Sequence, residues 1–385
     1  MTYDFTHCPD RSGTDSTKWA RYADRDIIPA WVADMDFVIA PEILGALRER
    51  LDHGLVGYPV QPPASTLAAV VEYLETRHGW KIDPSWVVFT PALVAALNAT
   101  IRAFAGSGSV VTHVPIYPPF ISAPANSGHA LTRVPMDWDA AKHRWFMDPA
   151  RLEAATPADA EVFMLCNPYN PLGRVFDREE LEAIAAYAEK HDLTVCSDEI
   201  HCDLILDETK RHLPFATLSP AVADRTISLF AASKTWNLAG FFCGFAVIPN
   251  AARRNAFRRV AEGVMNEVNV LGYVATEAAY RHGEPWRRAL LPVLRTNLDL
   301  IEAMCRETPG VVLRQRPEAT YLAWLDVSAL GFEHPRLAFE AGGVGMNNGA
   351  DFAGPGHVRL NFACPTDRLR EILRRIRATA LAAKG

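Results

Sequence analysis

The stretch "AEVFMLCNPYNPLGRVFDREELEAIAAYAEKHDLTVCSDEI", residues 160–200, decides the fold class of this chain. It opens with the nearly continuous apolar run AEVFMLC and closes with a second run, LTVCSDEI, and both favour buried strands. Between them, residues 177–192 have helical periodicity and begin with a capping-box pattern, Asp177 followed by Glu180. A strand, a helix and a strand of this kind predict a parallel sheet that is covered by helices on both faces.

The segments on either side extend this pattern. Apolar runs predict further strands at 109–115 and 225–231, and an amphipathic pattern predicts a helix over 41–54. Beyond residue 283 a long helix leads into the last third of the chain, where VVLRQRP, ATYLAWLDV and HVRLNFAC favour strands. A final helix is expected from 365 to 384. The sequence therefore predicts a large α/β domain and a smaller α+β domain that packs with the N-terminal segment.

The composition excludes several classes of protein. The chain has 385 residues, 49% of them hydrophobic and 22% charged, which is ordinary for a globular protein with room for two domains. Its net charge of −6 provides no basic surface for nucleic acid. Because no uninterrupted apolar run reaches about 18 residues and the N-terminus is polar, we expect a cytoplasmic protein without a membrane span. The seven cysteines lack metal-type spacing, so we expect core thiols rather than disulfides or a metal site.

Chemically useful side chains follow the predicted strands. In an open parallel sheet, ligands collect at the carboxyl ends of the strands. The side chains expected at that edge are an aromatic, an amide, a carboxylate, an imidazole, a hydroxyl and an amine: Tyr117, Asn170, Asp198, His201, Ser233 and Lys234. Because these strand ends meet at one edge of the sheet, we expect the side chains to converge on one site.

Lys234 lies in the mostly apolar stretch SLFAASKTWNLAG, residues 228–240. From this stretch alone, a solvent-facing lysine at the end of a strand is the simpler interpretation. A buried ammonium costs free energy unless it is paired, its pKa is lowered, or the amine is bonded covalently. Together with Asp198, the lysine favours pyridoxal phosphate, which needs an amine for its Schiff base and an acid for its pyridine nitrogen.

A seat for the cofactor's phosphate is expected in the stretch FTPALVAAL. Thr90 is the expected N-cap of a helix and Pro91 its first residue. The amides of Ala92 and Leu93 would then be free at the positive end of that helix, where phosphate groups bind.

Eight motifs, in order along nearly the whole chain, extend these observations: RSGTDSTKWARY, IPAWVADMDF, HGLVGY, NPYNPLGRVF, SDEIHCDL, ASKTWNLAG, ATYLAWLD and VRLNFACP. With them the sequence resembles fold-type-I, pyridoxal-phosphate-dependent enzymes of the aminotransferase class I/II superfamily. It looks most like the cystathionine β-lyase or C–S lyase (MalY/PatB) branch. The resemblance implies a mostly parallel seven-stranded sheet in a large domain, 46–284. It implies that 1–45 and 285–385 form the smaller α+β domain.

The resemblance also implies roles around the cofactor ring. Lys234 would form the Schiff base, and Asp198 would pair with the pyridinium nitrogen. Asn170 would hold the phenolic oxygen and lie next to the substrate. Tyr117 would stack on the ring, and His201 falls where relatives often have a tyrosine that binds the phenolic oxygen. For His201, a satisfied core histidine is an equally simple alternative.

Further residues would hold the phosphate and the substrate. Ser233 and the amides of Ala92 and Leu93 would bind the phosphate. Tyr58 would reach in from the neighbouring subunit of a homodimer and complete the catalytic group. Arg359 would grip the α-carboxylate of a small amino-acid substrate in a bidentate fork, which suits the geometry of arginine.

Two positions depart from the family pattern. Many aminotransferases have an arginine for the phosphate eight residues after the lysine, where this chain has Phe242. The family often has glycine where Ala92 stands, and a left-handed backbone there would strain an alanine.

Three functions remain compatible with these residues. Loss of the Cα proton precedes both the expulsion of a β-thiolate, which is C–S lyase chemistry, and transamination. The whole-chain resemblance and Phe242 favour the lyase, with L-cystathionine or another cysteine S-conjugate as the substrate, and an aminotransferase is the alternative. A non-catalytic protein that keeps the fold is the third interpretation. A nicotinamide dehydrogenase is disfavoured because no G-x-G-x-x-G follows a predicted strand.

Overall fold

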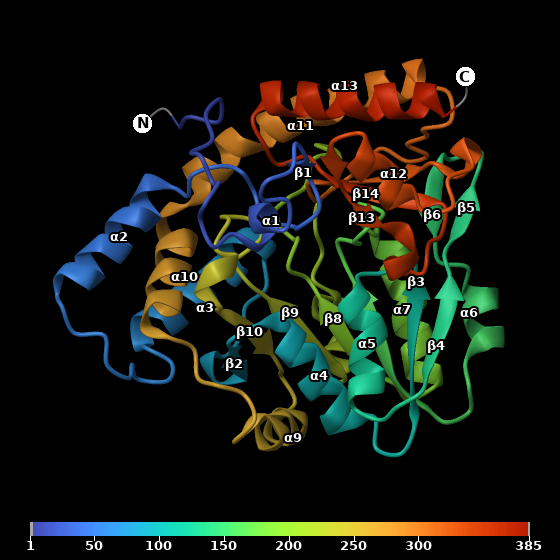
Figure 1. Ribbon diagram of the computed structural model, residues 1–385. Helices are drawn as coiled ribbons and strands as arrows, with labels where there is room; N and C mark the ends of the chain where they lie inside the picture. Colours follow the sequence, from blue (N-terminus) through green and yellow to red (C-terminus); the bar gives the residue numbers. More distant parts are fainter. Residues whose placement is uncertain (1–2, 384–385) are drawn as a thin grey trace.

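A seven-stranded sheet organises the chain in the computed structural model, which describes residues 3–383 (Figure 1). Its strands are β2 (Val87–Thr90), β3 (Ser109–Val114), β4 (Leu131–Pro135), β7 (Ala160–Cys166), β8 (Thr194–Asp198), β9 (Thr226–Phe230) and β10 (Gly244–Val247). They are arranged in the order β2-β10-β9-β8-β7-β3-β4. From β9 to β4 all neighbours are parallel, whereas β10 is antiparallel to both β2 and β9. The predicted mostly parallel seven-stranded sheet is confirmed.

Helices cover both faces of this sheet. The helices of the chain, including those of its C-terminal part, are α1 (Thr17–Ala20), α2 (Pro41–Asp52), α3 (Ala64–His78), α4 (Leu93–Phe104), α5 (Pro118–Asn126), α6 (Pro149–Ala155), α7 (Arg178–Lys190), α8 (Pro220–Asp224), α9 (Ala251–Ala261), α10 (Val270–His282), α11 (Glu284–Glu307), α12 (Pro335–Ala341) and α13 (Thr366–Ala382). On β10, Phe245 and Val247 face the apolar cluster that includes α3 and α10, whereas Ala246 faces the cluster that includes α4. This alternation explains why the strands are apolar on both faces.

The predicted crossover between β7 and β8 has the expected local structure. Helix α7 begins with a capping box, in which Asp177 accepts from the amide of Glu180 and the Glu180 side chain accepts from the amide of Asp177. The reciprocal bonds satisfy two amides that the helix itself leaves free. After α7 the chain enters β8, which pairs in parallel with β7, as the sequence predicted.

A three-stranded sheet forms the core of the C-terminal part. Its strands are β11 (Leu322–Asp326), β14 (His357–Asn361) and β13 (Asn347–Asn348), in the order β11-β14-β13. In Figure 1, α11 and α13 lie together at the top of the molecule, above these strands. The remaining strands are short: β1 (Ile28–Pro29), β5 (Asp137–Asp139), β6 (Arg144–Phe146) and β12 (Val344–Gly345).

The N-terminal segment joins this C-terminal part. Strand β1 pairs in parallel with β12, and the amide of Asp36 donates to the carbonyl of Ala363. These pairings support a smaller domain built from both ends of the chain. The proposed boundary between residues 45 and 46 falls within α2, so the domain bounds stay a prediction.

One predicted strand is wrong. The segment VVLRQRP, residues 311–317, makes a single bridge, between Val312 and Asp326, instead of a ladder. Two features of this segment oppose a ladder: the side chain of Arg314 pairs with the carboxylate of Asp326, and Pro317 has no amide to donate.

Within residues 3–383, no helix is both long and apolar enough to cross a membrane. All seven cysteines are free thiols.

Candidate active site

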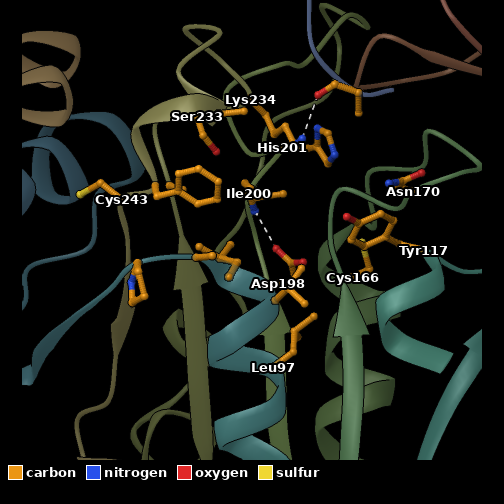
Figure 2. Close-up of a pocket in the computed structure, with 18 residues that line it drawn as sticks. Leu97, Tyr117, Cys166, Asn170, Asp198, Ile200, His201, Ser233, Lys234 and Cys243 are labelled. Carbon is orange, nitrogen blue, oxygen red and sulfur yellow. Dashed lines mark hydrogen bonds between the residues drawn. The ribbon is translucent and has the colours of Figure 1, made fainter. Parts of the chain in front are cut away.

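A pocket lies at the carboxyl ends of β7, β8 and β9 (Figure 2). Eight of the predicted site residues line it: Tyr117, Asn170, Asp198, His201, Ser233, Lys234, Ala92 and Leu93. Most of them lie at or just after the end of a strand: Asp198 is the last residue of β8, and Ser233 and Lys234 follow β9. The expectation that these side chains converge at one edge of the sheet is confirmed.

Asp198 is a buried acid, with 5% of its surface exposed. Its Oδ1 accepts from the amide of Ile200 at 3.2 Å, and its carboxylate forms no ion pair within residues 3–383. Burial raises the pKa of Asp198 to about 7, opposed by the bond from Ile200 and the charge of Lys234. A buried acid that faces a pocket without a paired cation fits a ligand that brings its own positive group, such as a protonated pyridine nitrogen.

Lys234 is a half-buried amine that donates from Nζ to the carbonyl oxygen of Ala33 at 2.8 Å. Burial and, to a smaller extent, the nearby guanidinium of Arg359 lower the pKa of Lys234 to about 8. The carboxylates of Asp34 and Asp198 act in the opposite direction. A lowered pKa makes the neutral, nucleophilic amine available near neutral pH, as imine formation requires.

His201 lies in the same pocket, next to Lys234 (Figure 2). Burial lowers its pKa to about 3, so the ring is neutral at physiological pH. Its Nδ1 has no hydrogen-bond partner among the described residues. A satisfied core histidine would have one, so the geometry favours a contact between this atom and a ligand.

Arg359 is not a lining residue, but it reaches the pocket through Asn170. Its Nη1 donates to Oδ1 of Asn170 at 3.0 Å, and its Nη2 donates to Oδ1 of Asn347 at 2.7 Å and to the carbonyl of Trp31 at 3.1 Å. It is 3% exposed, and no carboxylate in the described part of the chain pairs with it. Burial lowers its pKa to about 10, which still leaves it charged at neutral pH. A buried cation without an anion fits a substrate carboxylate.

The expected phosphate seat differs from the prediction in one respect. Helix α4 begins at Leu93, with Ala92 as its N-cap, so the assignment of Thr90 as N-cap and Pro91 as first helical residue is wrong. The reason is the extended backbone of Ala92, with φ −158° and ψ 149°, which postpones the first helical turn. This conformation carries no left-handed strain. The amides at the start of α4 and the side chain of Ser233 border the pocket together, as a phosphate requires.

Tyr58 and Phe242 lie at the outside of the site. Tyr58 is 99% exposed and is not among the residues that line the pocket of its own chain. Its proposed contact needs a second subunit and stays a prediction. Phe242 lines the pocket with a left-handed backbone, φ +50°, at the position where many aminotransferases have arginine. The pocket therefore lacks a cation at that point.

The backbone of residues 31–37 contributes contacts that no sequence pattern predicts. Here the carbonyl of Ala33 accepts from Lys234, and the carbonyl of Trp31 accepts from Arg359. A main-chain carbonyl is present at every position, so residue type gave no signal for these contacts.

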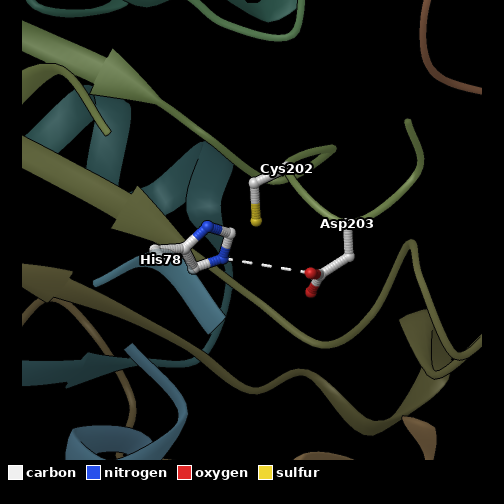
Figure 3. A group of neighbouring side chains, drawn as sticks. All are labelled: His78, Cys202 and Asp203. Atoms are coloured by element: carbon white, nitrogen blue, oxygen red, sulfur yellow. Dashed lines mark ion pairs between the residues drawn. The ribbon is translucent and has the colours of Figure 1, made fainter. Parts of the chain in front are cut away.

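Apart from the residues that line the pocket, the ligand atoms of His78, Cys202 and Asp203 lie within 4.8 Å of one another (Figure 3). Such a group suggests a metal site, but its atoms already have protein partners. Asp203 accepts from Nε of Arg77 at 2.8 Å and from the hydroxyl of Tyr73 at 2.5 Å. That hydroxyl also lies 3.0 Å from Nε2 of His78. We interpret the group as a buried hydrogen-bond cluster that supports the loop after β8.

The fold and this pocket define an enzyme of the aminotransferase class I and II family, to which the chain belongs: the family model matches residues 32–376. Cystathionine beta-lyase PatB of Bacillus subtilis (strain 168) is 37% identical over 381 residues, which are 96% of this chain and 97% of that protein. This similarity confirms the resemblance to the MalY/PatB branch.

Two solved structures are similar over almost the whole chain. A crystal structure of OvoB has a TM-score of 0.95 and 42% identity, covering 98% of this chain and 99% of that one. The structure of cystalysin from Treponema denticola, which contains a pyridoxal 5'-phosphate cofactor, has a TM-score of 0.93 and 28% identity, covering 99% and 100%.

Proposed function

We propose that this protein is a pyridoxal-phosphate-dependent C–S β-lyase. It would cleave L-cystathionine or a related cysteine S-conjugate by α,β-elimination to a thiol, pyruvate and ammonia. One observation supports it above all: within residues 3–383, neither the buried acid Asp198 nor the buried cation Arg359 forms an ion pair. Asp198 would face the ring nitrogen of the cofactor, and Arg359 would face the carboxylate of the substrate. The similarity to cystathionine beta-lyase PatB over 96% of the chain favours the lyase over an aminotransferase.

When bound, the cofactor supplies an electron sink for the charge that develops when the Cα proton of the amino acid leaves. Lys234 would hold the cofactor through its amine, and its free amine would be the base that removes this proton. Asp198 keeps the pyridine nitrogen protonated, because its buried carboxylate gains an ionic partner there. Ser233 and the first amides of α4 bind the phosphate.

Arg359 binds the substrate carboxylate with the donors that the protein leaves free. A guanidinium has five N–H donors. Three of them are used by Asn170, Asn347 and the carbonyl of Trp31, whereas Nε has no partner within residues 3–383. The N–H of Nε and one N–H of Nη1 remain, and they point to different sides of the guanidinium, so each would donate singly. A bidentate fork would also need one N–H of Nη2, which would exchange its contact with Asn347 or Trp31 for the substrate carboxylate.

The active unit in this proposal is a homodimer. The loop after α2 exposes four apolar side chains close together: Leu55, Val56, Tyr58 and Val60, at 69%, 58%, 99% and 76%. A monomer rarely leaves such a run uncovered, so a second copy of the chain is its proposed partner. Tyr58 would then border the partner's phosphate seat.

The test supplies L-cystathionine to the purified, cofactor-loaded protein without any keto-acid acceptor. Stoichiometric pyruvate, ammonia and homocysteine are expected. Turnover that appears only when a keto acid is added would contradict the lyase and support the aminotransferase. A protein that never binds pyridoxal 5'-phosphate would contradict both.

A further inference from the structure

The carbonyl oxygen of Ala33 accepts two hydrogen bonds from far along the chain. Lys234 donates to it from Nζ at 2.8 Å, and Tyr321 donates to it from its hydroxyl at 2.9 Å. Tyr321 lies directly before β11, is 1% exposed, and packs its ring edge-on against His201 at 6.2 Å between centroids. Tyr321 therefore contacts both the Ala33 carbonyl, which accepts from Lys234, and His201, which lies next to Lys234 in the pocket.

This carbonyl is held in a fixed orientation. The carbonyls on either side of it, those of Val32 and Asp34, both accept from the side-chain amide of Asn361, at 2.5 and 2.7 Å. Asn361 is 2% exposed and ends β14. Because both neighbouring peptide groups are anchored to one side chain, the Ala33 carbonyl cannot turn away from Lys234 without breaking these bonds.

We propose that the Ala33 carbonyl is the resting site of the Lys234 amine whenever that amine is not bonded to the cofactor, and that Tyr321 is the positioning residue that loosens this contact. A carbonyl that shares its lone pairs between two donors binds each of them less strongly. A hydrogen bond from an ammonium stabilises the charged form of that amine. By competing for the oxygen, the Tyr321 hydroxyl keeps more of the amine neutral and free to react.

The proposal rests on the proposed function but goes beyond it, since neither the fold nor the comparisons assign a role to Tyr321. The other charged or titratable groups that face the amine are Asp34, Asp198, His201 and Arg359. Replacing the tyrosine by phenylalanine changes none of them. A change in the behaviour of the amine is then attributable to the lost hydroxyl.

The experiment uses the full-length protein freed of cofactor. The rate at which it forms an imine with pyridoxal 5'-phosphate is followed by absorbance from about pH 6 to pH 10. Only the neutral amine attacks the aldehyde, so the midpoint of the profile reports the ionisation of Lys234. We expect Tyr321→Phe to move the midpoint to higher pH and to slow imine formation near pH 7 roughly three- to tenfold, the effect of about one hydrogen bond.

Tyr22→Phe is the matched control, since the Tyr22 hydroxyl is also buried but donates to Glu340. Its profile should equal that of the parent. Equal profiles for the parent and Tyr321→Phe would overturn the proposal, whereas a parent that forms no imine would overturn the proposed function itself. If Tyr321→Phe does not fold, 3-fluorotyrosine placed at position 321 gives a more acidic hydroxyl. A midpoint that fails to move to lower pH would then overturn the proposal.

Discussion

Nη1 of Arg359 donates to Oδ1 of Asn170 across 3.0 Å, and this bond links the smaller sheet to the loop that follows β7. It also fixes the orientation of the amide. With its oxygen bound to Arg359, Asn170 presents its nitrogen to the pocket, as Figure 2 shows. The same residue can therefore donate to the phenolic oxygen of the cofactor and hold the arginine that binds the substrate.

Asn170→Asp should disturb this arrangement in a specific way. A carboxylate at 170 would pair with the guanidinium of Arg359 and compete with the substrate carboxylate. We expect KM for the amino acid to rise about tenfold or more, the equivalent of about 1.4 kcal/mol. The control is Asn170→Ala, which removes the donor to the cofactor but leaves Arg359 charged. Steady-state kinetics decide, and an unchanged KM in Asn170→Asp would contradict the proposed role of Arg359.

Lys234→Ala removes the amine that would hold the cofactor. We expect no absorbance of an imine, no product after borohydride reduction, and loss of lyase activity by a factor of about 1,000 or more. Lys234→Arg distinguishes the effect of losing the imine from the effect of losing the positive charge, because a guanidinium is a cation that does not form the imine. Borohydride-dependent attachment of cofactor to Lys234→Ala would show that another amine bonds to it.

The elements that the sequence predicted best have a strong local signal. The run AEVFMLC forms β7 over its whole length, and Asp177 with Glu180 caps α7 as expected. Asp198 and Lys234 were found because parallel strands bring their carboxyl ends to one edge. In each case the information lies in residue type and period, which a single sequence contains.

The features that the sequence did not reveal depend on backbone position. The start of α4 is set by the extended conformation of Ala92, to which Thr90 and Pro91 give no clue. The contact between Lys234 and the carbonyl of Ala33 spans 201 positions of the chain. Any residue at position 33 would offer the same oxygen, so only the packed structure identifies it.

Asp198 should make the stability of the cofactor-free chain depend on pH. Burial raises its pKa from 3.8 to about 7, so between these values the folded chain keeps a proton that the unfolded chain releases. The contribution of this group to stability is then complete below about pH 4 and is lost as the pH rises to about 7. Asp198→Asn removes the titration.

We therefore expect Asp198→Asn to gain stability relative to the parent as the pH rises from about 4 to 7, by roughly 1–4 kcal/mol at the upper end. Urea unfolding of both cofactor-free proteins at several pH values measures this difference. Buried histidines such as His201 have lowered pKa values and the opposite dependence, but they are present in both proteins and cancel. A difference in stability that is constant with pH would contradict a buried, proton-binding Asp198.

The exposed Tyr58 predicts that two inactive chains can restore activity to each other. In the proposed dimer, each site takes Lys234 from one chain and Tyr58 from the other. A mixed dimer of a Lys234→Ala chain with a Tyr58→Ala chain therefore has one site with both defects and one site with neither. Random pairing yields half mixed dimers, so about a quarter of the parental sites should be intact.

The matched control combines Lys234→Ala with Asp198→Ala. Both residues border the pocket of the same chain, so every site in that mixed dimer is defective and no recovery is expected. The chains are mixed, denatured and refolded together, and lyase activity is compared with that of each variant alone. Recovery in the Tyr58 mixture but not in the Asp198 mixture requires a site shared between subunits. The Tyr58 side chain is 99% exposed in its own chain, so it could contact a cofactor only in the site of a partner subunit. A Tyr58 mixture that is no more active than the separate variants would therefore contradict the proposed contact.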